Sequence, residues 1–158
     1  MGKQNLYEAG MRVPFVIAGP GIRRGRSPAL VYLHDLFPTL CDLAGEPVPT
    51  GLDGRSLVPV LRGRQEGVRE TLFTAYRDVQ RAVRDRRWKL IRYPRIHRTQ
   101  LFDLRNDPDE RRDLAGDPRY RERIEQLRAK LEEWQKDQGD PTPWSFEPRQ
   151  DETFRPPR

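Results

Sequence analysis

A chain of 158 residues is long enough for one sizeable core, because a domain of about 150 residues buries roughly 68–70% of its unfolded surface. Its net charge of +6 arises from 30 basic and 24 acidic residues that are interleaved along the sequence, which favours a surface of ion pairs over a nucleic-acid-binding face. The single cysteine, Cys41, excludes an internal disulfide, and with only His34 and His97 beside it no zinc site is predicted.

The first strongly patterned segment is the apolar run from Val13 to Ala18, which a Gly-Pro-Gly turn closes. Its apolar residues are consecutive and do not alternate with polar ones. This pattern predicts a strand buried on both faces, inside a mostly parallel sheet that helices cover. Within the polar lead-in before it, Glu8 and Arg12 lie four residues apart and are expected to form a structural ion pair if the lead-in is helical.

The next segments predict loops and two helices. Residues 22–26 form a loop rich in glycine and arginine, typical of an exposed loop, with an anion-binding rim as the alternative. A short extended segment over residues 30–33 precedes a helix over residues 34–44 that Gly45 ends, with Cys41 in its buried stripe. After a Pro/Gly linker, Ser56 is predicted to cap a short helix that Gly63 ends.

Four short β-prone runs follow, over residues 72–76, 80–84, 88–93 and 100–104. Their close spacing predicts an antiparallel meander. In the third run, Trp88, Leu90 and Arg92 fall on one face of the sheet, and the alternate residues fall on the other.

Asp117 and Pro118 are a typical helix start, with an aspartate as N-cap and a proline at the first helical position. A single apolar stripe follows at helical spacing, and it is expected to lie on the meander: Tyr120, Ile124, Leu127, Leu131 and Trp134. Residues 141–158 are rich in proline, arginine and acids, which predicts an extended or disordered tail.

Several of these pieces, in this order, resemble the sulfatases of the alkaline-phosphatase-like superfamily: GKQNLYEAGMRVP, FVIAGPGI, DLFPTLCDLAG, DGRSLVPVL, QRAVRDRRWKLIRY and QLFDLRNDPDERRDLA. The resemblance implies the C-terminal part of a longer enzyme, with an α/β (α+β) fold. Residues 1–66 would then be the end of the family's central sheet, residues 67–140 a small four-stranded antiparallel subdomain packed with a C-terminal amphipathic helix, and residues 141–158 a tail.

The same resemblance implies sulfate-ester hydrolysis by a formylglycine beside a calcium ion, both expected in a full-length parent. The C/S-x-P-x-R motif that yields formylglycine is absent from this sequence, so no nucleophile and no metal ligand is assigned to it. Only Lys3 matches a catalytic position of the family, where a lysine contacts the substrate sulfate; a compact ammonium suits a tetrahedral anion. Arg81, Arg84 and Lys89 are candidates for a substrate rim, with exposed strand-face charges as the favoured alternative.

Three functional hypotheses follow. The first is the C-terminal part of a sulfatase, inactive alone, that meets a sulfate-ester substrate through the missing N-terminal part. The second is a small basic module that binds polyanions, although no aromatic-and-basic motif predicts nucleic acid. The third is part of a phosphoester or phosphonate hydrolase. No apolar run predicts a membrane span and no leader predicts a signal peptide, so localisation stays open, although the resemblance implies a periplasmic or secreted parent.

Overall fold

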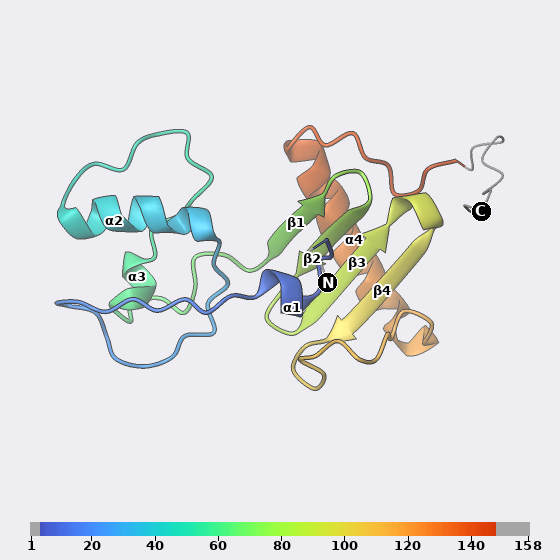
Figure 1. The fold of residues 1–158 in the computed structure, drawn as a ribbon, viewed down its shortest axis with the longest axis horizontal. Coiled ribbons are helices and arrows are strands. Elements are labelled where there is room, and N and C mark those ends of the chain that lie inside the picture. The colour runs from blue at the N-terminus through green and yellow to red at the C-terminus, as the bar shows by residue number, and fades with distance from the viewer. Residues whose placement is uncertain (1–3, 148–158) are drawn as a thin grey trace, which may run out of the picture.

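The structure, a computed structural model, describes residues 4–147 as two lobes (Figure 1). The small lobe, residues 12–70, contains α2 (Leu36–Ala44), preceded by one 3-10 turn (Leu33–Asp35), and α3 (Val58–Leu61). The sheet lobe consists of residues 4–11, with α1 (Glu8–Met11), and residues 71–147. Its later elements are β1 (Leu72–Tyr76), β2 (Gln80–Arg84), β3 (Trp88–Tyr93), a 3-10 turn (Pro94–Ile96), β4 (Arg98–Asp103), a 3-10 turn (Pro118–Tyr120) and α4 (Arg121–Asp137).

The sheet is the predicted meander, with antiparallel strands in the order β1-β2-β3-β4. Val83 lies opposite Leu90, and Leu90 lies opposite Leu101, so alternate residues of neighbouring strands share a face. The two predicted faces of β3 are confirmed. The fourth strand begins at Arg98, two residues before its predicted start, because pairing with Tyr93 extends the ladder to the end of β3.

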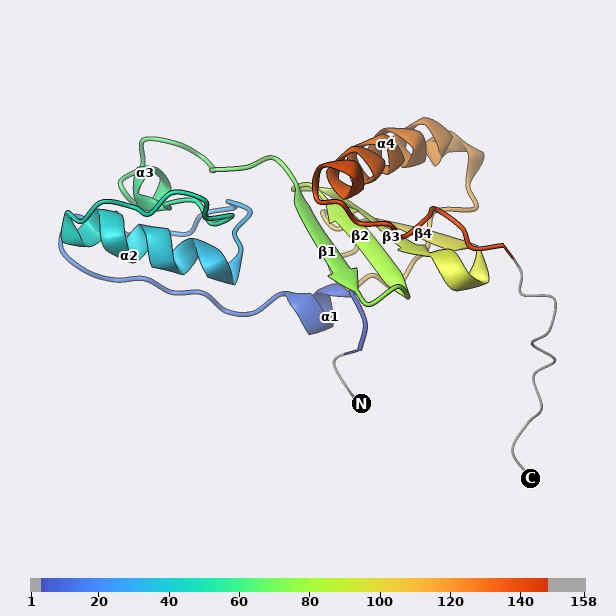
Figure 2. The same cartoon turned by 90° about the horizontal axis from the view of Figure 1, so that it is seen from above.

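The amphipathic helix α4 covers one face of the sheet (Figure 2). Leu127 and Leu131 are fully buried and form one core with apolar residues of the strands, Val83, Leu90 and Leu101. The other stripe residues, Tyr120, Ile124 and Trp134, pack against this core. The Asp117 side chain accepts from the N–H of Arg119 at 3.0 Å, as expected of an N-cap, although the first turn is 3-10.

In the small lobe, both predicted helices are present. Gly45 ends α2 with φ +76°, a left-handed conformation that glycine adopts without steric cost. The Ser56 hydroxyl accepts from the N–H of Val58 at the start of α3. Gly54 brings the two helices together, because a Cβ at this position would lie 2.3 Å from the carbonyl oxygen of His34.

The strand expected over Val13–Ala18 is not formed, nor is a strand formed over residues 30–33. Both segments are irregular, and Val16 is 88% exposed. A strand needs neighbours to receive its backbone hydrogen bonds, and between residues 4 and 147 only the four strands of the sheet lobe pair with one another. The stripe of α2 is also less buried than predicted, since Phe37 and Leu40 are 54% and 53% exposed.

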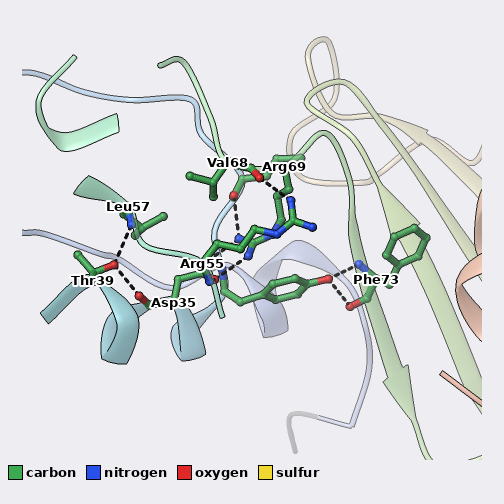
Figure 3. A network of polar contacts seen from close by, with 9 residues as sticks. Asp35, Thr39, Arg55, Leu57, Val68, Arg69 and Phe73 are labelled. Atoms are coloured by element: carbon green, nitrogen blue, oxygen red, sulfur yellow. Dashed lines mark hydrogen bonds and ion pairs between the residues drawn. The ribbon is translucent and has the colours of Figure 1, made fainter. Parts of the chain in front are cut away.

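The small lobe is held together at Asp35, whose side chain is completely buried (Figure 3). Its carboxylate accepts from both terminal nitrogens of Arg69, and from the backbone N–H groups of Tyr32 and Arg55 at 2.7 and 2.9 Å. Burial alone would raise the pKa of Asp35, but these hydrogen bonds outweigh it and hold the pKa below its usual value. The carboxylate therefore stays ionised and fixes segments from three parts of the chain.

Tyr32, which donates its backbone N–H to Asp35, links the small lobe to the sheet. Its hydroxyl donates to the carbonyl oxygen of Phe73 in β1 at 2.9 Å and accepts from the N–H of the same residue (Figure 3). The Arg69 guanidinium stacks over the Tyr32 ring, 4.7 Å from its centre. The contact between the small lobe and β1 is thus mostly polar.

The segment after α4 is held along the sheet lobe by three arginines. Arg81 of β2 binds the carboxylate of Asp140 with two nitrogens, the second at 2.9 Å from Oδ1. The guanidinium carbons of Arg92 and Arg128 lie 4.8 and 4.5 Å from the centre of the Trp144 ring. Residues 141–147 are therefore extended and held against the lobe, whereas the rest of the predicted tail lies outside the described residues.

Candidate functional site

Residues 4–8 lie on the face of the sheet opposite α4 (Figure 2). Leu6 is buried there and forms a second core with one apolar residue from each of three strands, Ala82, Ile91 and Phe102. The polar lead-in of the sequence is therefore part of the sheet lobe, although the whole small lobe, residues 12–70, separates it from β1.

Two glutamine side chains of the sheet fix this segment. Gln80 acts as a backbone mimic: its oxygen accepts from the N–H of Leu6 at 3.0 Å, and its nitrogen donates to the carbonyl oxygen of Gln4 at 3.3 Å. The Tyr7 hydroxyl donates to the side-chain oxygen of Gln100 at 2.7 Å. These bonds resemble those that an additional strand would make, but they come from side chains.

A cluster of four charges continues the attachment at Glu8. The Lys89 ammonium lies 3.0 Å from Glu8 Oε1 and 2.9 Å from Glu110 Oε1. Arg84 binds the other oxygen of Glu8 at 2.5 Å. Glu110 also accepts from the backbone N–H of Glu8. Two cations and two carboxylates thus make the cluster electrically neutral.

Neutrality is what allows this cluster to be buried. The Lys89 side chain is only 2% exposed, and an isolated buried ion costs several kcal/mol of desolvation. The sheet supplies Arg84 and Lys89, and Glu110 follows β4, so the sheet alone carries an excess positive charge at this place. The carboxylate of Glu8 removes that excess when the segment binds.

Tyr93 borders the same face. Burial, followed by the neighbouring Tyr7 hydroxyl, raises the pKa of Tyr93 above its ordinary value of about 10. Its phenol is therefore protonated at physiological pH and adds no negative charge to a cluster that is already balanced.

The four predicted site residues do not form one group. Lys3 lies outside the described residues, directly before the attached segment. Arg84 and Lys89 are opposite each other in the β2–β3 register and both bind Glu8. Arg81 lies on the α4 face, bound to Asp140.

The expectation that these three were exposed strand-face charges is wrong for Arg81 and Lys89, which are both buried. Each has a carboxylate partner inside the chain, which offsets the desolvation cost of the charge. A role for the three residues at a substrate rim stays a prediction. The polyanion-binding hypothesis is weakened, because the charges on which it depends are neutralised internally.

The sequence did not reveal that the carboxylates of Glu8 and Glu110 pair with the cations of β2 and β3. Glu8 was expected to pair with Arg12, yet it reaches across to β2 and β3. One signal was present: Lys89 shares its strand face with Ile91 and Tyr93, and a lysine among buried residues requires an acidic partner. The identity of that partner depends on contacts over 76 to 102 residues of sequence, which periodicity does not reveal.

No group of three or more His, Cys, Asp or Glu residues within the described range could hold a metal ion. The expected calcium ion therefore has no fitting set of ligands in residues 4–147. Over the same residues, no helix is both long and apolar enough to cross a membrane.

Comparison with known protein families shows which family the chain belongs to. Residues 1–137 match the family model described as N-sulphoglucosamine sulphohydrolase, C-terminal. The match includes Lys3, the segment on the sheet, the small lobe and all of α4.

Individual relatives agree with this match. A Delta 4,5-hexuronate-2-O-sulfatase from Bacteroides thetaiotaomicron is 37% identical over 82% of this chain and 30% of its own length. A choline-sulfatase from Rhizobium meliloti is 42% identical over 74% of the chain and 24% of its own length. A phosphonate monoester hydrolase from Silicibacter pomeroyi superposes with a TM-score of 0.72 at 26% identity, over 89% of this chain and 32% of that one. The chain therefore spans about a third or less of the length of each.

Proposed function

Because this chain belongs to the sulfatase family, whose C-terminal domain it matches over residues 1–137, we propose that it acts as the C-terminal domain of a sulfuric ester hydrolase. In this role it contributes Lys3 to the substrate sulfate and the sheet lobe that holds the segment next to Lys3. The observations that support the proposal are the family match and the attachment of residues 4–8, which follow Lys3 in the sequence, to the sheet.

The small lobe supports a role within a larger protein. Its apolar side chains at Val13, Val16, Phe37 and Leu40 are exposed in this chain. Exposed apolar groups concentrated on one lobe are typical of an interface. We infer that the remaining two-thirds of the enzyme covers them, since the relatives are about three times as long as the matched region.

Formylglycine and calcium supply the nucleophile and its activation in the proposed full-length enzyme, and neither is assigned to a residue of this chain. The 158-residue chain alone is therefore expected to hydrolyse no aryl sulfate above background. Lys3 would act on the sulfate through its charge, which its reference pKa of about 10.4 keeps positive at neutral pH.

The test is a chimaera in which this chain replaces the matching C-terminal third of the Bacteroides hexuronate sulfatase. The chimaera should hydrolyse a sulfate ester, and Lys3→Ala should lower its turnover by about 10²–10³, as for other single contacts to developing charge. Lys3→Arg should restore little, because a planar guanidinium does not occupy the place of a compact ammonium. Full activity of Lys3→Ala, or turnover by the chain alone, would overturn the proposal.

A phosphonate monoester hydrolase is the second candidate, favoured by the superposition with the Silicibacter enzyme. Sulfate and phosphonate esters are both tetrahedral anions, and a lysine serves either. The chimaera should therefore be assayed on an aryl sulfate and on a phosphonate monoester in parallel. A higher kcat/KM for the phosphonate would favour the second candidate.

A further inference from the structure

The attached segment has a consequence beyond the proposed function, on which this inference rests. We propose that the sheet positions Lys3 by holding residues 4–8 in a clamp, and that Lys89 is the positioning residue, through its ion pair with Glu8. The clamp consists of the side chains of Gln80, Arg84, Lys89, Gln100 and Glu110. Lys89 does not touch the substrate. It acts on the reacting sulfate only through the backbone that leads from Glu8 to Lys3.

The geometry of the clamp supports this role. Every described residue from Gln4 to Glu8 except Asn5 has a polar contact with the sheet lobe. The contacts come from three strands and from Glu110, so the segment is held from several directions. A fixed backbone next to a catalytic side chain limits the freedom which that side chain must lose when substrate binds, and catalysis depends on placement to within about an ångström.

Charge makes the clamp specific. Gln80 and Gln100 would also bind other extended segments, since they recognise backbone and hydroxyl groups. Lys89 and Arg84 require a carboxylate, and Glu8 places one between them while its own N–H meets Glu110. Only one register of the segment puts the carboxylate between these cations, so the ion pairs set the register of the segment that follows Lys3 in the sequence.

The experiment has two readouts, and the first needs no activity. The amides of Leu6 and Glu8 donate to side chains of the sheet lobe, so their hydrogen exchange in the 158-residue chain reports the clamp directly. Glu8→Gln and Lys89→Met should each raise exchange at Leu6 by tenfold or more. Amides of α4 should keep their protection. Glu125→Gln and Lys130→Met, on the exposed side of α4, are the matched controls.

The second readout is kinetic and uses the chimaera. Glu8→Gln and Lys89→Met should lower kcat by about 10–10² with a smaller change in KM, because a displaced Lys3 loses mainly transition-state contact. The double variant should be scarcely worse than either single one, since both remove the same pair. In the Lys3→Ala background, Lys89→Met should have no further effect on kcat.

The outcomes separate the inference from the proposed function. Unchanged exchange at Leu6 in both variants overturns the clamp. Faster exchange with unchanged kcat, in a chimaera that Lys3→Ala does disable, overturns the positioning role of Lys89. If Lys3→Ala leaves the activity of the chimaera unchanged, the proposed function is wrong, and so is the catalytic role of the clamp. The hydrogen-exchange result still decides whether the clamp exists.

Discussion

The two lobes bury their apolar residues to very different extents. In the sheet lobe, both faces of the sheet are covered, by α4 on one side and by residues 4–8 on the other, and the leucines of β3, β4 and α4 are fully buried. In the small lobe, Phe37 and Leu40 of α2 are half exposed and Val16 is almost fully exposed. The sheet lobe thus has a core of its own, whereas the small lobe has apolar surface to offer to a further part of the enzyme.

This difference in burial indicates which lobe supplies most of the stability of the chain. Stability is concentrated in the sheet lobe, because buried apolar area is the main favourable contribution to folding. The hydrogen bonds between Tyr32 and Phe73 connect the small lobe to the sheet lobe. Changes in the two lobes should therefore have separable effects on stability.

Leu127→Asp should unfold the sheet lobe. The change removes a fully buried side chain and introduces a carboxylate without a partner, which together cost more than about 5 kcal/mol. Thermal unfolding followed by far-UV circular dichroism measures the effect. Glu132→Ala on the exposed side of α4 is the control, since it removes one pair with Arg128 worth about 0.3–0.5 kcal/mol. Equal melting temperatures for the two variants would contradict the buried stripe.

Asp35→Asn should loosen the small lobe and leave the sheet lobe intact. It leaves the guanidinium of Arg69 buried without a countercharge, and breaking a buried pair in this way costs about 3–5 kcal/mol. Hydrogen exchange by mass spectrometry should show faster exchange in α2 and α3, with β3 and β4 protected as before. Loss of protection in both lobes together would contradict their independence.

Asp140→Asn should lower stability at neutral pH and much less in acid. The Arg81 guanidinium, which binds Asp140, holds the pKa of this carboxyl far below its ordinary value of about 3.9. Because the folded pKa is depressed, the stabilisation is present above the unfolded pKa and is lost as the pH falls through the folded one. The difference in unfolding free energy between wild type and variant, about 1–3 kcal/mol at pH 7, should therefore shrink below about pH 4. A difference independent of pH would show that Arg81 does not hold Asp140 ionised.

Phe37→Ser together with Leu40→Ser should change the stability of the 158-residue chain by less than about 0.5 kcal/mol, because both side chains are half exposed. In the chimaera the same pair of changes should prevent the two parts from associating. Urea unfolding measures the first effect, and size-exclusion chromatography of the chimaera after limited proteolysis measures the second. A large loss of stability in the chain alone would mean that the small lobe buries these residues itself.

The sequence predicted local structure well wherever an element is completed within this chain. The four strands and α4 follow from periodicity, because their partners are neighbours along the sequence and each face is covered. The run from Val13 to Ala18 has the composition of a central strand, but composition does not reveal whether paired strands are present. This segment is irregular here because its backbone finds no strand to pair with among the described residues.

The candidate site was predicted only in part. The resemblance identified Lys3, and the strand pattern placed Lys89 on the face that residues 4–8 cover. Neither indicated that Glu8 and Glu110 complete the cluster, since Glu110 follows β4 in an irregular segment with φ +55°. Long-range charge pairing is set by the tertiary fold, and single residues in loops carry no periodic signal for it.

The clamp also orders the events of folding. Each strand of the sheet pairs with its neighbour in sequence, so the sheet forms through short loops. Leu6 and Gln80 are 74 residues apart, and Glu8 and Glu110 are 102 apart, so the segment closes the longest loops and docks after the sheet. On the ribosome, Glu8 must wait for those 102 residues, about 5–20 s at typical elongation rates. Residues 4–8 thus dock only after the sheet that receives them has been made, and until then the charges of β2 and β3 lack the carboxylate that neutralises them.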